Sequence, residues 1–362
     1  MSSSKPNRTP WWSWVWPVVA LVILALQLTH WTSFVLSVAE ALALIATVFA
    51  AVYHAEVVAL RVGEPFGTLV LALAVTVIEV ALVVSVMIAG GPETATLARD
   101  TIFAVVMIVC NGIIGICLLA GGLRHHEQGF QLWGANATLT VLIALTTLTL
   151  VLPNVTIATA GPTFSPPQLA FEAIVSLILY LVFLFVQNVR HRYYFLPIGT
   201  GQEEQYSPPP SNMVALVSAG LLLMSLVIVV GMAKVLTPTV ERGIEAAGAP
   251  RNVVGIIIAG LVLLPEGLAS YRAATANRLQ TSINLALGSA LASIGLTIPA
   301  VAGISLVLSK PLTLGLSPKE EVLLALTLVV SILSLGTGRT TVLQGIVHLI
   351  LFAVFLFLAV VP

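Results

Sequence analysis

The sequence predicts an all-α multi-pass membrane protein with about 11 transmembrane helices. Of its 362 residues, 58% are hydrophobic and only 8% are charged, against about 25% charged residues in ordinary soluble domains. Apolar runs of about 20 residues, the length that spans a bilayer, fill most of the chain. The lipid bilayer is therefore an expected partner. The formal net charge is zero and the chain has no long basic or acidic tail, so no nucleic-acid partner is expected.

Charge clusters, Pro/Gly turns and apolar lengths set the expected helix boundaries. The first run follows Lys5 and Arg8 and is longer than the apolar core of a secretory signal, so we expect a retained first span. The small-residue segment 39–41 leaves cleavage open. Cys110 and Cys117 lie about 10 Å apart along one helix, so we expect packing rather than a disulfide. The expected helices are 11–30, 35–60, 65–89, 100–122, 133–153, 168–189, 212–236, 252–274, 281–308, 319–336 and 340–361.

The distribution of basic residues predicts the orientation. With a cytoplasmic N-terminus, nine of the 15 Lys and Arg residues fall on the cytoplasmic side and six on the opposite side. Because basic residues concentrate in cytoplasmic loops, we expect the N-terminus inside and the C-terminus outside.

Two intramembrane glutamates occur in matching contexts. Glu79 stands fourteen residues after Pro65 in "GEPFGTLVLALAVTVIEV", and Glu266 stands sixteen residues after Pro250 in "PRNVVGIIIAGLVLLPEG". A charge at the bilayer centre costs at least about 2.5–3.5 kcal/mol, so such residues are functional candidates by default. A single Glu can also be a satisfied structural hydrogen-bonding group. Two at matching positions favour function.

The two glutamates fall in the third and eighth expected helices, which cross the membrane in opposite directions. This arrangement indicates an inverted-topology repeat with a binding site near the midplane at the repeat interface. Each Glu helix is followed by a Gly-rich partner, "CNGIIGICLLAGG" and "INLALGSALASIGLTIP". Interrupted helices of this kind can turn carbonyl oxygens toward an ion.

A pair of carboxylates in a dry site must be neutralised before the protein changes conformation. Two protons can do so, and so can one divalent cation, so the pair predicts cation–proton exchange. Hard cations such as Ca²⁺ prefer oxygen ligands, and the motifs lack sulfur and imidazole, which argues against soft transition metals. One Na⁺ or K⁺ with a residual proton would also suffice. Further expected ligands or lining residues are Thr76, Asn111, Asn284 and Ser289.

The paired motifs resemble the two repeats of the cation/calcium exchanger superfamily, above all its bacterial calcium/proton branch, whose members are also described as sodium- and potassium/proton antiporters. The resemblance implies that Glu79 and Glu266 bind the cation and that the second and seventh helices are gates. It also implies a bacterial inner membrane location and no cofactor. The implied division is an extra helix (1–32), a first five-helix repeat (33–190), a cytoplasmic linker (191–211) and a second repeat (212–362).

The chain departs from this pattern at several positions. The usual Gly-Asn pair before each Glu is replaced by Thr76-Val77 and Leu263-Leu264. Lys234 aligns where the seventh helix often has a Glu; it is a candidate countercharge or a snorkelling side chain. Glu56 and His54 are candidates for a proton path or gate, with a lining or capping role as the alternative for Glu56.

The remaining polar residues have simpler expected roles. We expect exposure at the interface for Glu40, with a role as an outer-gate acid as the alternative. For Glu172 we expect a place near a helix N-terminus. We expect a solvated turn at 124–127, a tight turn at 336–341 and core packing for His348.

The alternatives to antiport are a passive cation channel and, less well supported, an intramembrane enzyme, for which protease motifs are missing. The oligomeric state is not predicted.

Overall fold

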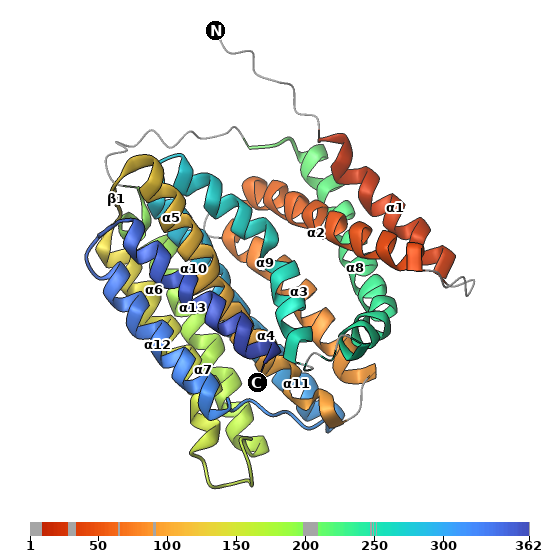
Figure 1. Cartoon of the computed structure of the whole chain (residues 1–362). Helices are drawn as coiled ribbons and strands as arrows, with labels where there is room; N and C mark the ends of the chain where they lie inside the picture. Colours follow the sequence, from red (N-terminus) through yellow and green to blue (C-terminus); the bar gives the residue numbers. More distant parts are fainter. Residues whose placement is uncertain are drawn as a thin grey trace. The chain divides into compact units, whose positions relative to one another are not determined.

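The computed structural model of the chain describes residues 9–27, 34–63, 66–89, 92–197, 209–246, 248, 250 and 252–361. Within these residues the chain forms eleven continuous helical segments (Figure 1). Their α-helices are α1 (Trp11–Gln27), α2 (Phe34–Val62), α3 (Phe66–Ala89), α4 (Leu97–Met107), α5 (Ile114–His125), α6 (Leu132–Thr146), α7 (Pro166–Phe185), α8 (Asn212–Ala246), α9 (Asn252–Thr275), α10 (Leu279–Ala292), α11 (Ile298–Leu308), α12 (Pro318–Leu335) and α13 (Val342–Val360).

Four π-helical turns interrupt or extend these helices in the described part of the chain. The turn η2 (Ile108–Ile113) joins α4 to α5, and η7 (Ser293–Thr297) joins α10 to α11. The turns η3 (Thr147–Val151) and η5 (Val186–Arg190) follow α6 and α7. The interruptions expected in the partner helices are therefore π-turns, which occur frequently at functional sites. Short 3₁₀ helices occupy η1 (Pro92–Thr96), η4 (Leu152–Asn154) and η6 (Arg192–Phe195).

The helix segments match the expected spans one for one. Among the described residues, nine helices are long and apolar enough to cross a membrane, and α1 is a shorter apolar helix. The largest difference is α8, which was expected to end at residue 236 and continues to Ala246 with Pro238 inside it. Apolarity marks only the membrane-embedded part of a helix, so the sequence pattern did not predict this extension.

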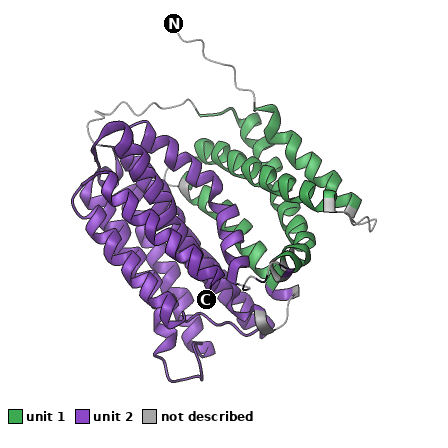
Figure 2. Cartoon of the chain, viewed as in Figure 1, with its two compact units in different colours: residues 1–86, 203–243 green, residues 87–202, 244–362 purple. Residues whose placement is uncertain are grey.

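The chain forms two compact units (Figure 2). Unit 1 consists of residues 1–86 and 203–243, and unit 2 of residues 87–202 and 244–362. Unit 1 thus holds α1, α2, most of α3 and most of α8. The units group helices by packing, whereas the expected repeats group them by order along the chain.

In unit 1 the first helix packs along α2 and also touches α8. Gly231 of α8 lies against the side chain of Leu24, where a Cβ atom would come within 2.8 Å of Leu24 Cδ2. The α2–α3 turn begins at Gly63, whose φ of 76° is favourable for glycine. Its backbone N–H closes α2 by donating to the carbonyl of Ala59.

In unit 2 the central helix is α9, which packs against α4, α5 and α10. Helix α13 packs along α5, α7 packs on α11, and α6 lies against α10 and α12. Small residues allow the backbones of α5 and α13 to approach closely, as in other membrane helix pairs. A Cβ atom on Gly345 of α13 would lie 2.5 Å from the Leu119 backbone nitrogen and 2.9 Å from the Gly115 carbonyl oxygen.

Side chains cap the N-termini of three helices in unit 2. The helices α7, α12 and α13 begin with capping boxes formed by Ser165–Gln168, Ser317–Glu320 and Thr341–Gln344. These contacts satisfy backbone N–H groups that have no partner inside the helix.

The end of α5 and the α5–α6 loop both contact the last turn of α9. Gln128 donates through Nε2 to the Ala274 carbonyl at 2.9 Å, and a ring nitrogen of His125 lies 3.0 Å from the Thr275 carbonyl oxygen. Residues 128–129 (β1) pair with residues 339–340 (β2), and Arg339 forms an ion pair with Glu127 at 3.2 Å. The two expected turns, 124–127 and 336–341, are thus joined to each other.

We expect Gly345→Ala to lower the free energy of unfolding by about 1–3 kcal/mol, because the added methyl must push apart two packed backbones. The matched control is Gly303→Ala in α11, where no described atom lies within 4 Å of the position that the added Cβ atom would take. That change should be neutral or slightly stabilising. Thermal unfolding of the purified protein in detergent measures both, and equal melting temperatures for the two variants would contradict this packing.

Candidate functional site

Glu79 lies near the middle of α3 and is fully buried, at 0% exposure. Its companion on the helix is Thr76, three residues earlier and 6% exposed. Residues at this spacing share one helix face. The Thr76 hydroxyl has no hydrogen-bond partner among the described residues. Unit 1 therefore presents a carboxylate beside an available hydroxyl within an apolar helix.

Glu266 occupies the corresponding place in α9 of unit 2. It is the fifteenth residue of this 24-residue helix, and Glu79 is the fourteenth of the 24 residues of α3. Pro265 has no N–H, so the carbonyl of Leu261 lacks its usual helical donor. Ser270, one turn after Glu266, is fully buried, and its hydroxyl has no hydrogen-bond partner within the described chain. Ser270 was not among the candidates expected from the sequence, because a single Ser in a helix belongs to no recognisable motif.

The segment that carries Glu266 lies against the π-turn η2. A Cβ atom on Gly267 would lie 3.3 Å from Ile113 Cδ1, and α9 contacts η2, α5 and α10. The Gly-rich partner helices expected from sequence therefore do pack beside the Glu helix in this unit.

Asn111 lies in η2 but its side chain is already bonded to other protein groups. Its Nδ2 donates to Thr327 Oγ1 of α12 at 2.9 Å, and its Oδ1 lies 3.1 Å from His348 Nδ1 of α13. His348 was expected to be a core residue; it is fully buried, and it also belongs to this hydrogen-bonded group.

Asn284 lies in α10 and is likewise bonded to protein groups. Its Nδ2 donates to the Phe195 carbonyl at 2.7 Å and its Oδ1 accepts from Gln280 Nε2 at 2.8 Å. Gln280 in turn accepts from the Gln131 backbone N–H. Ser289, five residues further along α10, is half-buried. Unit 2 thus contains Glu266, Asn111, Asn284 and Ser289.

His54 of α2 holds the first helix in place. A ring nitrogen, Nε2, lies 3.0 Å from the Ser13 carbonyl oxygen of α1. That carbonyl would normally accept from the N–H of residue 17, but residue 17 is Pro and has no N–H. The histidine therefore supplies a donor that the α1 helix lacks. Trp12 and Tyr53 pack edge to face beside this contact, with ring centroids 5.4 Å apart.

The other candidates in unit 1 differ in exposure. Glu56 of α2 and Lys234 of α8 are exposed. Glu40 was expected to be exposed, and this expectation is wrong: it is only 3% exposed. Its helical spacing places it on the same face as Ala43, Leu44 and Thr47, which are buried.

Glu172 is placed differently from the expectation of a helix N-terminus. It is the seventh residue of α7, beyond the first turn in which the helix dipole acts. It is 5% exposed, and Ser176 Oγ donates to its Oε1 at 2.6 Å. A hydroxyl one turn away thus satisfies part of this buried carboxyl group.

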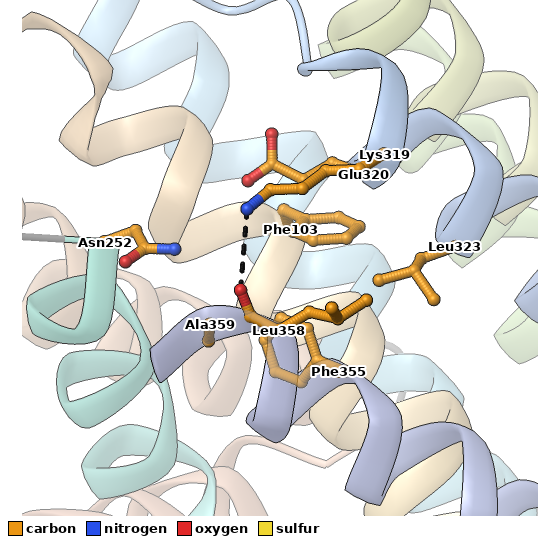
Figure 3. Close-up of a pocket in the computed structure, with 8 residues that line it drawn as sticks. All are labelled: Phe103, Asn252, Lys319, Glu320, Leu323, Phe355, Leu358 and Ala359. Atoms are coloured by element: carbon orange, nitrogen blue, oxygen red, sulfur yellow. Dashed lines mark hydrogen bonds between the residues drawn. The ribbon is translucent and has the colours of Figure 1, made fainter. Parts of the chain in front are cut away.

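A small pocket lies at one end of unit 2, between α4, α12, α13 and the start of α9 (Figure 3). Lys319 Nζ of α12 donates to the Leu358 carbonyl of α13 at 3.5 Å (Figure 3). Asn252 lines the opposite wall, fourteen residues before Glu266, which corresponds to about 21 Å along a helix. The pocket is therefore separate from the Glu266 segment.

Each unit carries one carboxylate at the middle of an apolar helix, with hydroxyl or carbonyl oxygen beside it. All of these groups are hard oxygen ligands, which suit alkali and alkaline-earth cations. A carboxylate in this setting can also bind a proton. The chemistry available is therefore reversible binding of a cation or a proton, as in a membrane transporter.

Comparison with known proteins defines the family. The sodium/calcium exchanger protein family profile matches residues 32–189 and 217–361. The chain belongs to this family, and within the cation/calcium exchanger superfamily it is related to the bacterial calcium/proton branch. The family is one of transporters, and the chain is a multi-pass integral membrane protein of the cation/proton antiporter type.

Individual relatives agree with this assignment. The chain is 51% identical over 99% of its length to a protein of Sinorhizobium fredii named as an ionic transporter, y4hA, and covers 98% of it. It is 36% identical over 95% of its length to the sodium-potassium/proton antiporter ChaA of Escherichia coli, and covers 94% of that protein. A third relative, 25% identical over 49% of the chain and 51% of its own length, is the Ca²⁺/H⁺ antiporter ChaA of Bacillus subtilis.

Solved structures share the fold. The structure of native YfkE aligns with a TM-score of 0.75 at 18% identity, over 97% of this chain and 100% of that one. The crystal structure of the H⁺/Ca²⁺ exchanger CAX aligns with a TM-score of 0.71 at 14% identity, over 95% and 87%.

The contact between His54 and Ser13 makes a specific thermodynamic prediction. We expect His54→Leu to lower the stability of the protein by about 1–3 kcal/mol, because the Ser13 carbonyl loses its donor inside an apolar environment. In a Pro17→Ala background, residue 17 regains a backbone N–H, which can donate to the Ser13 carbonyl. The same His54→Leu change should then cost clearly less. Thermal unfolding of the four proteins completes the cycle; equal penalties in both backgrounds would contradict it.

Proposed function

We propose that this protein exchanges cations for protons at Glu79 and Glu266, with Ca²⁺/H⁺ exchange as the principal reaction and Na⁺/H⁺ and K⁺/H⁺ exchange as further reactions. The observation that carries the proposal is the matching place of the two glutamates, residues 14 and 15 of two 24-residue apolar helices. The action of both carboxylates on one ion is inferred from the repeat in the sequence.

Neutralisation provides the coupling. A charged carboxylate inside the membrane is expensive, so in the proposed cycle each Glu holds either a proton or a share of a cation while the protein changes conformation. Because the two kinds of ligand compete for the same oxygens, entry of one releases the other. A divalent cation balances two carboxylates, and a monovalent cation with one retained proton does the same.

The remaining cation ligands are oxygens near each Glu. Thr76 supplies a hydroxyl in α3, while Ser270, Ser289 and the Leu261 carbonyl are candidates in unit 2. Asn111 and Asn284 are bonded to protein groups, so we assign them positioning roles. Ca²⁺ takes 6–8 oxygens and accepts water among them, which leaves room for solvent in the coordination shell.

The proposed transport cycle is alternating access in which α2 and α8 act as gates. Glu56, exposed on α2, and Lys234, exposed on α8, belong to these helices, and His54 links α2 to α1. We propose a bacterial inner membrane location from the resemblance to the bacterial antiporters. The distribution of basic residues supports a cytoplasmic N-terminus and an external C-terminus.

The relatives are named after different transported ions, and the proposal includes Ca²⁺ as well as Na⁺ and K⁺. The Escherichia coli relative is named a sodium-potassium/proton antiporter and the Bacillus subtilis relative a Ca²⁺/H⁺ antiporter.

Proton release from inside-out vesicles with an acidic interior, followed with a pH-sensitive dye, distinguishes the transported ions. We expect proton release on addition of Ca²⁺ and, to a smaller extent, Na⁺ or K⁺. A response to Na⁺ and K⁺ alone would contradict the Ca²⁺ assignment but keep the antiporter.

We expect Glu79→Gln and Glu266→Gln each to reduce exchange at least about a hundredfold, because a neutral amide can neither release a proton nor balance a cation. Both proteins should remain folded in detergent. The matched control is Glu127→Gln, which alters an exposed glutamate in the α5–α6 loop. The same dye assay gives the rates. Normal exchange in both membrane variants would refute the proposed site.

A further inference from the structure

Three helices of unit 2 are joined by one chain of buried hydrogen bonds. Asn111 in η2 lies 3.1 Å from His348 of α13 and donates to Thr327 of α12 at 2.9 Å. Thr327 Oγ1 in turn donates to the sulfur of Met107 at 3.4 Å. Asn111, Thr327, His348 and Met107 are all fully buried, at 0% exposure. We call these residues the buried hydrogen-bond chain.

The orientation of the Asn111 amide sets the direction of these hydrogen bonds. Two acceptors face its Nδ2, the Thr327 hydroxyl oxygen at 2.9 Å and the Met107 sulfur at 3.7 Å. The Asn111 oxygen then faces His348 and can only accept. His348 must therefore carry its proton on Nδ1 and donate it to Asn111. By geometry the other ring nitrogen, Nε2, has no hydrogen-bond partner among the described residues. The ring also interacts with the backbone of Cys110, which lies in the same π-turn η2 as Asn111.

The ring of His348 is held in place by close packing of its helix. A Cβ atom on Gly115 of α5 would lie 3.1 Å from His348 Cβ, and one on Gly112 would lie 3.3 Å from the ring of Phe352. Helix α13 therefore has little freedom to slide along η2 and α5. The donor atom of His348 is fixed relative to the π-turn.

The far side of the same π-turn contacts the helix that carries Glu266. Ile113, two residues after Asn111, lies against Gly267, which directly follows Glu266. Hence η2 stands between the buried hydrogen-bond chain and the Glu266 segment. A π-turn places one more residue between hydrogen-bonded groups than an α-helix does, and it occurs mostly as a single turn inside an α-helix.

We propose that His348 is a positioning residue for cation binding: its Nδ1–H bond to Asn111 keeps η2 in the π-helical form that places α9 and Glu266 correctly. This inference rests on the proposed function of Glu266. Neither His348 nor Asn111 touches the ion. Their effect reaches it through Ile113 and Gly267.

The test compares two substitutions of His348 in proteoliposomes, with Ca²⁺ as the transported cation. The amide nitrogen of Asn can occupy the place of the imidazole Nδ1, so His348→Asn retains a donor to Asn111. His348→Leu keeps a side chain of similar length without a donor. We expect His348→Leu to raise the apparent KM for Ca²⁺ about tenfold, as for loss of one buried hydrogen bond, with a smaller change in maximal rate. His348→Asn should stay within about twofold of the wild type.

A purely structural role for His348 would lower the melting temperature of both variants and leave KM unchanged, and that result would overturn the proposal. Equal KM values for the Asn and Leu variants would overturn it as well. If His348→Leu does not fold, Thr327→Val decides, because valine removes the acceptor at the other end of the chain: a raised KM supports the proposal and an unchanged KM overturns it.

Glu266→Gln separates this inference from the proposed function. Normal Ca²⁺ exchange in Glu266→Gln would refute the cation site itself. An inactive Glu266→Gln together with a wild-type KM in His348→Leu would refute only the positioning role.

Discussion

The cost of placing a charged group inside the membrane is the constraint on which this structure depends. Glu79 and Glu266 stand at the middle of helices that are otherwise apolar, and each must be neutral while the protein rearranges. In the function we propose, protons and cations compete to provide that neutrality, and exchange follows from the placement of the two carboxylates. Buried polar groups elsewhere in the described chain are subject to the same constraint. Ser176 donates to Glu172, and His54 donates to the Ser13 carbonyl, which has no helical donor because residue 17 is Pro.

Small residues and π-turns determine how the helices around Glu266 fit together. Gly115 and Gly345 bring the backbones of α5 and α13 into contact, and η2 lies between this pair and α9. Close packing of this kind replaces the hydrophobic driving force, which is weak between helices in lipid. The helix that carries Glu266 therefore contacts a π-turn that is itself hydrogen-bonded to α12 and α13, far away in sequence.

The eleven helices and the two glutamate motifs could be predicted because apolar length and the repeat are local properties of the sequence. The roles of Asn111 and His348 could not, since their contact joins residues 237 positions apart. The exposure of Glu40 was predicted wrongly because the prediction used its distance from the helix end. Its place on the same buried helix face as Ala43 and Thr47 was not considered. The π-turns at 108–113 and 293–297 also depend on tertiary packing; the Gly and Asn residues of the sequence indicate only where a helix is interrupted.

The central claim is that a cation and protons compete for Glu79 and Glu266. Calorimetric titration of the purified protein with Ca²⁺, repeated in buffers of different ionisation enthalpy, counts the protons released for each ion bound. We predict that Ca²⁺ binding releases protons and that this release is lost in Glu79→Gln and in Glu266→Gln. Binding of Ca²⁺ with no proton release by the wild-type protein would contradict the claim.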